Sequence, residues 1–358
     1  MERALAIPAV KGPIPVLLRT ILRRLAVGVV QLLGLTVAVF FLIRLMPADP
    51  VSRFVGINPS KAAYAQAAKA IGVDRPISTQ LLHYLGLAPS QGKGLLQGNL
   101  GTSWVSNAPV LKDIATALPV TLELITMAFI IALIIAVPIG MLAALRPGGK
   151  TDKAVFVYGL FAGSQPEFWW ALLFVFVFYF KLGIAPPPLG LINPMNSPPP
   201  PRTGFYTIDS LLAGDLTTFF DLLHHLMLPV ATLVFILSGP IIKMVRQNME
   251  QALTADFVLY ARAAGMPGST VARYALRAAM APSMTLIGIL YGFMLGGAVL
   301  VESVFSLPGI GQYAVRSILA FDYPAIQGVV LVITAISLVV YLLLDLLHAI
   351  IDPRLAQG

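Results

Sequence analysis

Six long apolar stretches constrain the fold more than any other feature of this 358-residue sequence. A helix needs about 20 apolar residues to cross about 30 Å of hydrocarbon, and backbone groups in lipid must be paired within the segment itself. The stretches are Leu25–Ile43, Leu124–Leu145, Ala154–Phe180, Leu222–Ile242, Ala278–Val301 and Ile326–Leu344. None alternates polar and apolar residues as the strands of a barrel do. The sequence therefore predicts an all-α polytopic membrane protein with six transmembrane helices.

Composition excludes the common soluble classes. Charged residues make up 11% of the chain and hydrophobic residues 58%, against about 25% and 45–50% in soluble domains. The absence of cysteine excludes a disulfide, a thiolate nucleophile and a Cys-ligated metal. In a chain this apolar, the formal charge of +8 indicates contact with anionic membrane lipids rather than with nucleic acid.

The distribution of Lys and Arg predicts the orientation. Segments 1–24, 146–153, 243–277 and 351–358 together hold 14 basic residues in 75 positions. The alternate connections, 44–120, 181–221 and 302–325, hold 10 in 142. Because cytoplasmic connections carry the excess of basic residues, the first set is predicted to be cytoplasmic, with both termini inside. Residues 1–24 are expected to stay as a cytoplasmic extension, because no clear cleavage site follows them.

The chain divides at these spans. The first transmembrane helix covers 25–46, and 47–118 form an external loop with short helices that starts with a break at Pro47–Pro50. A five-helix core follows over 119–350, and 351–358 form a cytoplasmic tail. Within the core, 185–221 contain two proline runs, which predict extended polyproline. Two interpretations of this outer loop remain open, a stiff spacer and a partner contact.

The longest inner connection, 243–277, predicts two cytoplasmic helices joined by a turn, and with the approach to the next span these coupling helices cover 245–282. The first is expected over Val245–Gly265, where the terminal glycine suits a positive φ. Ser269 or Thr270 is expected to cap the second, over Val271–Met280. Small side chains near the turn would let another protein's backbone approach closely. An ordinary amphipathic surface loop is the alternative, while a DNA-binding helix–turn–helix is disfavoured by the modest charge.

Several motifs, in the same order, resemble those of bacterial ABC-importer permeases of the dipeptide, oligopeptide and nickel branch. Tyr260–Gly265 resembles that family's cytoplasmic coupling loop, although Ala264 stands where Lys is common. Glu302–Gly311 and Asp322-Tyr323-Pro324 resemble the segment after the fifth span. Further matches occur at Leu45–Pro50, Gly98–Ser103, Leu118–Leu124, Gly163–Trp169 and Asp352-Pro353-Arg354. The resemblance covers roughly residues 20–355.

The resemblance implies the ABC type I importer permease fold and a place in the bacterial inner membrane. It implies a subunit that forms half of a translocation pathway for di- or oligopeptides or similar solutes. The implied partners are a second, homologous permease, two ATP-binding subunits and an extracytoplasmic solute-binding protein. The residues implied to couple the chain to the ATPases are Leu259, Tyr260, Ala261, Arg262, Ala263, Ala264 and Gly265.

Catalytic, cofactor and metal sites are not predicted. Gly149-Lys150-Thr151 lacks the earlier glycine of a phosphate loop, because position 144 is Ala144. The adjacent His224 and His225 would point about 100° apart on a helix and make no chelating pair. The chain is therefore expected to be a transport subunit, not an enzyme, which takes its energy from partner ATPases.

Charged residues within the spans mark candidate pathway positions, because a charge at mid-bilayer costs about 2.5–3.5 kcal/mol or more. Glu123 and Asp345 lie near span ends and are interpreted as structural. Glu167 lies deeper, and two roles stay open for it, in the pathway and as an interhelical partner. The other candidate pathway or gate residues are Met294, Phe305, Pro308 and Gly309.

Gly292 and Gly296 form a G-x-x-x-G pattern in the fifth span. Small residues one turn apart allow close helix packing, which we expect here, including against the second permease. The rival function is a self-contained, ion-coupled secondary transporter, and a structural scaffold is a third. Only isolated acids occur in the spans, which disfavours a proton relay. The sequence does not select among peptides, nickel chelates and sugars as substrate.

Overall fold

The computed structural model describes residues 13–46, 49–56, 59–88 and 93–351. These residues form helices joined by turns and loops, with no strand among them, as the sequence predicts. The long helices are α1 (Pro13–Leu45), α5 (Val110–Leu145), α9 (Leu216–Leu253), α11 (Gly268–Val304) and α13 (Tyr323–Ile351). Residues 1–12 of the expected extension, 352–358 of the expected tail, and Pro47 and Ala48 lie outside the described residues.

Shorter helices fill the connections. They are α2 (Ser52–Val55), α3 (Lys61–Ile71), α4 (Ile77–Leu85), the 3₁₀ turn Leu95–Gln97, α6 (Lys150–Ala162), α7 (Glu167–Phe174), the π-helical turn Val175–Lys181, α8 (Tyr206–Leu212), α10 (Asp256–Ala263) and α12 (Ile310–Leu319). Helix α5 begins nine residues before the expected core boundary at 119. The connection 47–118, which is predicted to be external, therefore contains helical segments of its own and also the start of a span.

The third predicted span is not one straight helix. Helices α6 and α7, the latter continued by the π-helical turn, meet at a bend of 102°. Pro166 occupies the N-cap of α7; it donates no backbone hydrogen bond and disfavours helical conformation in the residue before it. The six predicted spans thus correspond to five continuous apolar helices and this bent pair.

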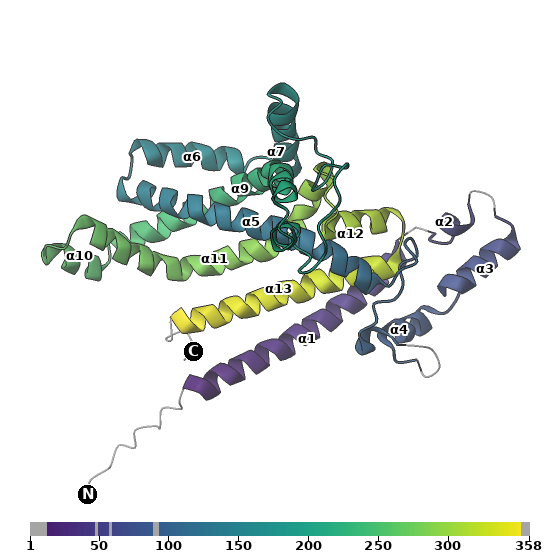
Figure 1. The fold of residues 1–358 in the computed structure, drawn as a ribbon. Helices are drawn as coiled ribbons and strands as arrows, with labels where there is room; N and C mark the ends of the chain where they lie inside the picture. Colours follow the sequence, from purple (N-terminus) through teal and green to yellow (C-terminus); the bar gives the residue numbers. More distant parts are fainter. Residues whose placement is uncertain (1–12, 47–48, 57–58, 89–92, 352–358) are drawn as a thin grey trace, which may run out of the picture.

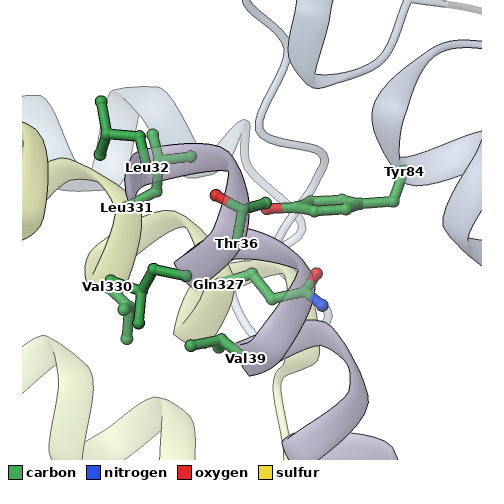
Figure 2. Close-up of a pocket in the computed structure, with 8 residues that line it drawn as sticks. Leu32, Thr36, Val39, Tyr84, Gln327, Val330 and Leu331 are labelled. Carbon is green, nitrogen blue, oxygen red and sulfur yellow. The ribbon is translucent and has the colours of Figure 1, made fainter. Parts of the chain in front are cut away.

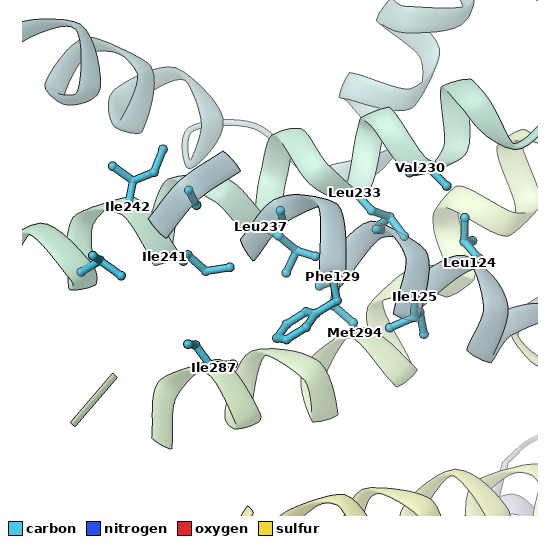
Figure 3. Packing of buried hydrophobic residues seen from close by; sticks show 14 of the residues in the cluster. Leu124, Ile125, Phe129, Val230, Leu233, Leu237, Ile241, Ile242, Ile287 and Met294 are labelled. Carbon is cyan, nitrogen blue, oxygen red and sulfur yellow. The ribbon is translucent and has the colours of Figure 1, made fainter. Parts of the chain in front are cut away.

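The core lies between α5, α9 and α11, and Figure 3 shows their apolar side chains pointing toward one another. Helix α5 presents a stripe of small buried residues at four-residue spacing, which consists of Ala128, Ala132, Ala136 and Gly140. A Cβ on Gly140 would lie only 2.9 Å from the carbonyl oxygen of Ile242 on α9. Small residues at this spacing let two helices approach closely, so the stripe explains why α5 and α9 form the densest packing in the chain.

Helix α1 packs along α13 at the side of this core (Figure 1). Figure 2 shows Thr36 and Val39 of α1 facing Gln327 and Val330 of α13, while Tyr84 reaches the crevice from α4. From Leu25 to Leu45, nearly all exposed side chains of α1 are apolar, as in a helix that faces lipid.

The connections gather at two ends of the helical body (Figure 1). The start of α1, the end of α13, the α5–α6 turn and α10 lie at one end, which we call the α10 end. Helices α2, α3, α4 and α12 lie toward the other, the α12 end. The described parts of the segments predicted to be cytoplasmic therefore share one end of the molecule.

Candidate functional site

Helix α10 is a short helix held between two spans, α9 and α11, at the α10 end. Its last turn closes with two backbone hydrogen bonds: the N–H of Gly265 donates to the carbonyl of Arg262 at 3.0 Å, and the N–H of Met266 donates to the carbonyl of Ala261 at 3.1 Å. This is the Schellman arrangement, in which the first of the two donor residues has a left-handed backbone conformation. Gly265 supplies it with a φ of +74°, so the positive φ predicted from the glycine is confirmed.

The structure corrects two boundaries of this segment. The first helix does not run unbroken over 245–265, because α9 continues to Leu253 and the Thr254 side chain bonds back to the carbonyl of Gln251 at 2.9 Å before α10 starts. Neither Ser269 nor Thr270 caps the second helix; Pro267 occupies the N-cap, and α11 continues as one helix into the span. Helix α10 is therefore an independent unit on two rigid helices.

The two faces of α10 differ. Val258 and Ala261 are buried against the core, at 0% and 4% exposure. Leu259 and Tyr260 point outward, at 54% and 76% exposure. The other exposed residues of α10 are Asp256, Phe257, Arg262 and Ala263. Ala264 and Gly265, which follow it, are exposed too, and nothing lies within 4 Å of a Cβ placed on Gly265. Leu259 and Tyr260 thus form an exposed knob of large apolar and aromatic side chains next to small residues. Such side chains contribute most of the binding free energy when another protein buries them, so this surface can serve as an interface.

An ion-pair network braces the helix that leads into α10. The guanidinium of Arg246 on α9 lies 2.8 Å from the carboxylate of Asp152 on α6 and 3.1 Å from that of Glu250. Asp152 also accepts a hydrogen bond from the N–H of Gly148 at 2.8 Å. On the other side of α9, Asn248 donates to the hydroxyl of buried Ser283 on α11 at 2.8 Å. These contacts tie the end of α9 to α6 on one side and to α11 on the other.

Glu302 organises the α12 end. Its side chain is fully buried and accepts hydrogen bonds from the hydroxyl of Thr121 and from the N–H of Gln312 at 3.0 Å. Thr121 in turn accepts the N–H of Ile310 at 2.9 Å. The carboxylate therefore satisfies the first turn of α12, where helix N–H groups lack partners. Gly309 and Gly311 leave room for it, because a Cβ on either would lie within 2.8 Å of this carboxylate.

Three other buried carboxylates accept backbone N–H groups in the same way. Glu123 accepts those of Tyr206 and Thr207 at the start of α8, at 2.9 and 2.8 Å. Asp322 accepts the hydroxyl of Ser103 at 2.5 Å. Asp209 accepts N–H groups from 202–204. The structure thus places Glu123 in the structural role expected from the sequence, while the side chain of Asp345 lies outside what the structure describes.

The Asp209 site predicts a pH dependence of stability. Burial raises the pKa of Asp209, but the hydrogen bonds from residues 202–204 outweigh it and hold the pKa below its ordinary value. Because the folded pKa lies below the unfolded one, these bonds stabilise the protein above about pH 4 and lose their effect as the pH falls through the folded pKa. We expect Asp209→Asn to lower the thermal midpoint of the purified transporter at pH 7, and we expect this difference from wild type to shrink as the pH falls below about 4.

Thermal unfolding of the wild type and the variant, measured from pH 3 to 7, checks this prediction. Asp74→Asn, at an exposed acidic residue, is the control and is expected to leave the midpoint unchanged at each pH. A gap between Asp209→Asn and wild type that stays constant across the range contradicts the assignment.

Glu167 differs from these carboxylates. It starts α7 at the bend, its side chain is partly exposed, and its Oε2 atom is buried without a hydrogen-bond partner. A Cβ placed on Gly297 of α11 would lie 3.2 and 3.3 Å from the two carboxylate oxygens and 3.3 Å from the Cε of Met294. The structure thus brings two of the sequence-predicted pathway residues, Glu167 and Met294, to one place on α11.

The remaining predicted residues lie in other surroundings. Phe305 is buried in the core. Pro308 and Gly309 line an open cavity of about 310 Å³ at the α12 end, together with Asp113, Tyr313 and Arg316. Gly292 packs inside the chain, because a Cβ there would lie 2.5 Å from the hydroxyl of Tyr341 on α13, whereas Gly296 has nothing within 4 Å.

Sequence reasoning missed the Arg246–Asp152 pair and the role of Glu302. Both partners of this ion pair lie in segments of excess basic charge, where one acid and one of several basic residues give no distinctive signal. The available signal for Glu302 was the pair of glycines in Pro308-Gly309-Ile310-Gly311, since closely spaced glycines indicate a close approach of another group.

Comparison with known proteins identifies the family. The sequence model of the binding-protein-dependent transport system inner membrane component matches residues 136–357, and that of the N-terminal region of the same membrane components matches residues 17–125. The two matches together span both the core and the segment from α1 into α5.

Individual relatives match over nearly their whole length. A probable D,D-dipeptide transport system permease protein of Escherichia coli is 37% identical over 95% of this chain and 98% of its own. A di/tripeptide transport system permease protein of Pseudomonas aeruginosa is 36% identical over 95% and 99%. A dipeptide transport system permease protein of Escherichia coli is 34% identical over the same shares. The chain therefore belongs to the binding-protein-dependent transport system inner membrane components, the membrane-spanning permeases of ABC importers.

Proposed function

We propose that this permease is half of the translocation pathway of an importer for di- or oligopeptides, and that α10 couples it to ATP-binding subunits in the cytoplasm. The complete transporter then contains a second, homologous permease, two ATP-binding subunits and an extracytoplasmic solute-binding protein. The names of the relatives support the peptide substrate. The exposed knob of Leu259 and Tyr260 on α10 carries the coupling assignment.

Coupling requires that ATP favour one of two arrangements of the permease. A ligand shifts such an equilibrium only by binding the two states with different affinity. In the proposed cycle, closure of the ATP-binding subunits pushes the outward face of α10, and its buried face, through Val258 and Ala261, carries the push into the core. Because α9 is tied to α6 by Arg246 and Asp152, the spans move as a packed body between inward- and outward-facing access.

The same proposal assigns the orientation and the pathway. The α10 end, with the start of α1 and the end of α13, lies in the cytoplasm, in keeping with the excess of basic residues in those segments. Glu167 and Met294 lie beside the route of the solute, and Pro308 and Gly309 lie at its outer entrance. The face that carries Gly296 on α11 contacts the second permease.

A single introduced cysteine tests the coupling assignment, because the chain has none of its own. We expect Tyr260→Cys, in the assembled complex, to cross-link to an ATP-binding subunit through a short thiol–amine reagent. Ile318→Cys, on an exposed position of α12 at the opposite end, is the matched control and should give no such product. Labelling of Tyr260→Cys by a membrane-impermeant reagent added outside intact cells contradicts the proposal.

The rival secondary transporter makes a different prediction. It would move solute as the purified chain alone, driven by a proton or sodium gradient. The importer requires the ATP-binding subunits, the second permease and the binding protein, and peptide uptake into proteoliposomes should appear only when all of them and ATP are present.

A further inference from the structure

One acidic side chain in the body of the protein has no partner. Among the residues that the structure describes, buried carboxylate oxygens are otherwise held by hydrogen bonds or, at Asp152, by Arg246 at 2.8 Å. Glu167 has a buried oxygen with neither. An unpaired buried charge is expensive in a protein interior and more so at membrane depth. The structural carboxylates Glu123 and Glu302 each accept hydrogen bonds from backbone N–H groups, and Oε2 of Glu167 has no such donor.

Glu167 lies against α11, next to an exposed face of that helix. The carboxylate faces Gly297, where any side chain would come within about 3 Å of both oxygens. Beside it, Phe293, Gly296 and Leu300 follow one another on one face of α11 at three- and four-residue spacing, and all three are exposed in this chain. Glu167 therefore lies partly exposed at the edge of the α11 face that we propose contacts the second permease, between the two halves of the pathway.

The missing partner has a definite chemistry. An ionised carboxylate is an acceptor only, and its strongest hydrogen bonds come from cationic N–H donors. No Lys or Arg of the described chain forms an ion pair with Glu167. An ammonium group, with three N–H donors on a compact centre, matches a lone carboxylate better than a planar guanidinium, which favours two parallel bonds.

We propose that Glu167 binds the N-terminal ammonium group of the peptide during its passage through the permease. This inference rests on the proposed function, since it needs a peptide in the pathway. The bond is transient, so the carboxylate has no resident partner while the pathway is empty.

The experiment compares two substrates in the complete reconstituted transporter, a dipeptide with a free amino terminus and its N-acetylated form. Each is supplied at the concentration that half-loads the solute-binding protein, so the preference of that protein is removed from the comparison. We expect Glu167→Gln to lower uptake of the free dipeptide about tenfold, the effect of losing one hydrogen bond to a charged group, and to leave uptake of the acetylated form unchanged. Glu167→Asp keeps the charge, so it should retain most of the uptake of the free dipeptide relative to the acetylated form.

The outcomes separate the two proposals. If Glu167→Gln lowers uptake of both substrates equally, or of neither, the carboxylate does not recognise the ammonium group. This inference then fails, while the proposed function stands. An equal loss of uptake for the two substrates would indicate that Glu167 pairs structurally with the second permease. Glu123→Gln, at a structural carboxylate, is the control for this outcome and should lower uptake of both substrates equally. If the wild-type complex moves neither loaded peptide, the proposed function fails and the inference with it.

Discussion

Replacing Glu302 by leucine is expected to remove most of the assembled transporter from the membrane. The carboxylate is fully buried and accepts bonds from Thr121 and Gln312. Leucine has a similar size but accepts nothing, so these donors stay buried and unpaired at about 1–3 kcal/mol each. The summed loss of several kcal/mol approaches the whole stability of a typical domain, about 5–15 kcal/mol. Immunoblots of membranes and the thermal midpoint of the purified complex measure the effect.

Two variants show whether the hydrogen bonds are responsible. Glu302→Gln keeps the shape and one acceptor oxygen, so it should accumulate to an intermediate level. Ser303→Ala alters the next residue, whose exposed hydroxyl bonds only to the carbonyl of Val299, and should behave as wild type. Accumulation of Glu302→Leu to the wild-type level, with an unchanged midpoint, contradicts the role assigned to the carboxylate.

The sequence is sufficient for those features that depend on local pattern. Apolar length identifies the spans, because the bilayer fixes how many residues a helix needs. Gly265 identifies the end of α10, because a residue with no Cβ is favoured at the left-handed position that closes the helix. The family motifs locate the coupling segment and the Glu302 region without any knowledge of which atoms meet there.

The features that the sequence does not reveal depend on residues far apart in the chain. Thr121 and Glu302 are separated by 181 positions, and Ser103 and Asp322 by 219. Nothing in either local segment indicates its partner. The 102° bend between α6 and α7 is a similar case: Pro166 predicts a break, but the packing of α7 against α9 and α11 sets the direction of the second helix.

Gly265→Trp is expected to abolish peptide uptake while ATP hydrolysis by the assembled complex continues. Gly265 is exposed at a φ of +74°, and no atom of this chain lies within 4 Å of its Cβ position. A side chain added there starts in open space and projects from the surface proposed to meet an ATP-binding subunit. The ATP-binding subunit would then bind and hydrolyse ATP without packing against α10. Its closing movement would therefore not reach α9 and α11.

Backbone strain is the competing explanation, and Gly265→Ala isolates it. Any side chain at a left-handed position costs roughly 1–2 kcal/mol, so alanine and tryptophan carry the same strain and differ only in bulk. If steric exclusion of the partner is the cause, alanine retains most of the uptake and tryptophan retains only the background seen without ATP, at equal levels of assembled complex. If both variants lose uptake to the same extent, the Schellman turn itself is what matters. Wild-type uptake by Gly265→Trp at equal expression would show that α10 does not contact an ATP-binding subunit during coupling. A closely packed interface at this position could not accommodate an indole.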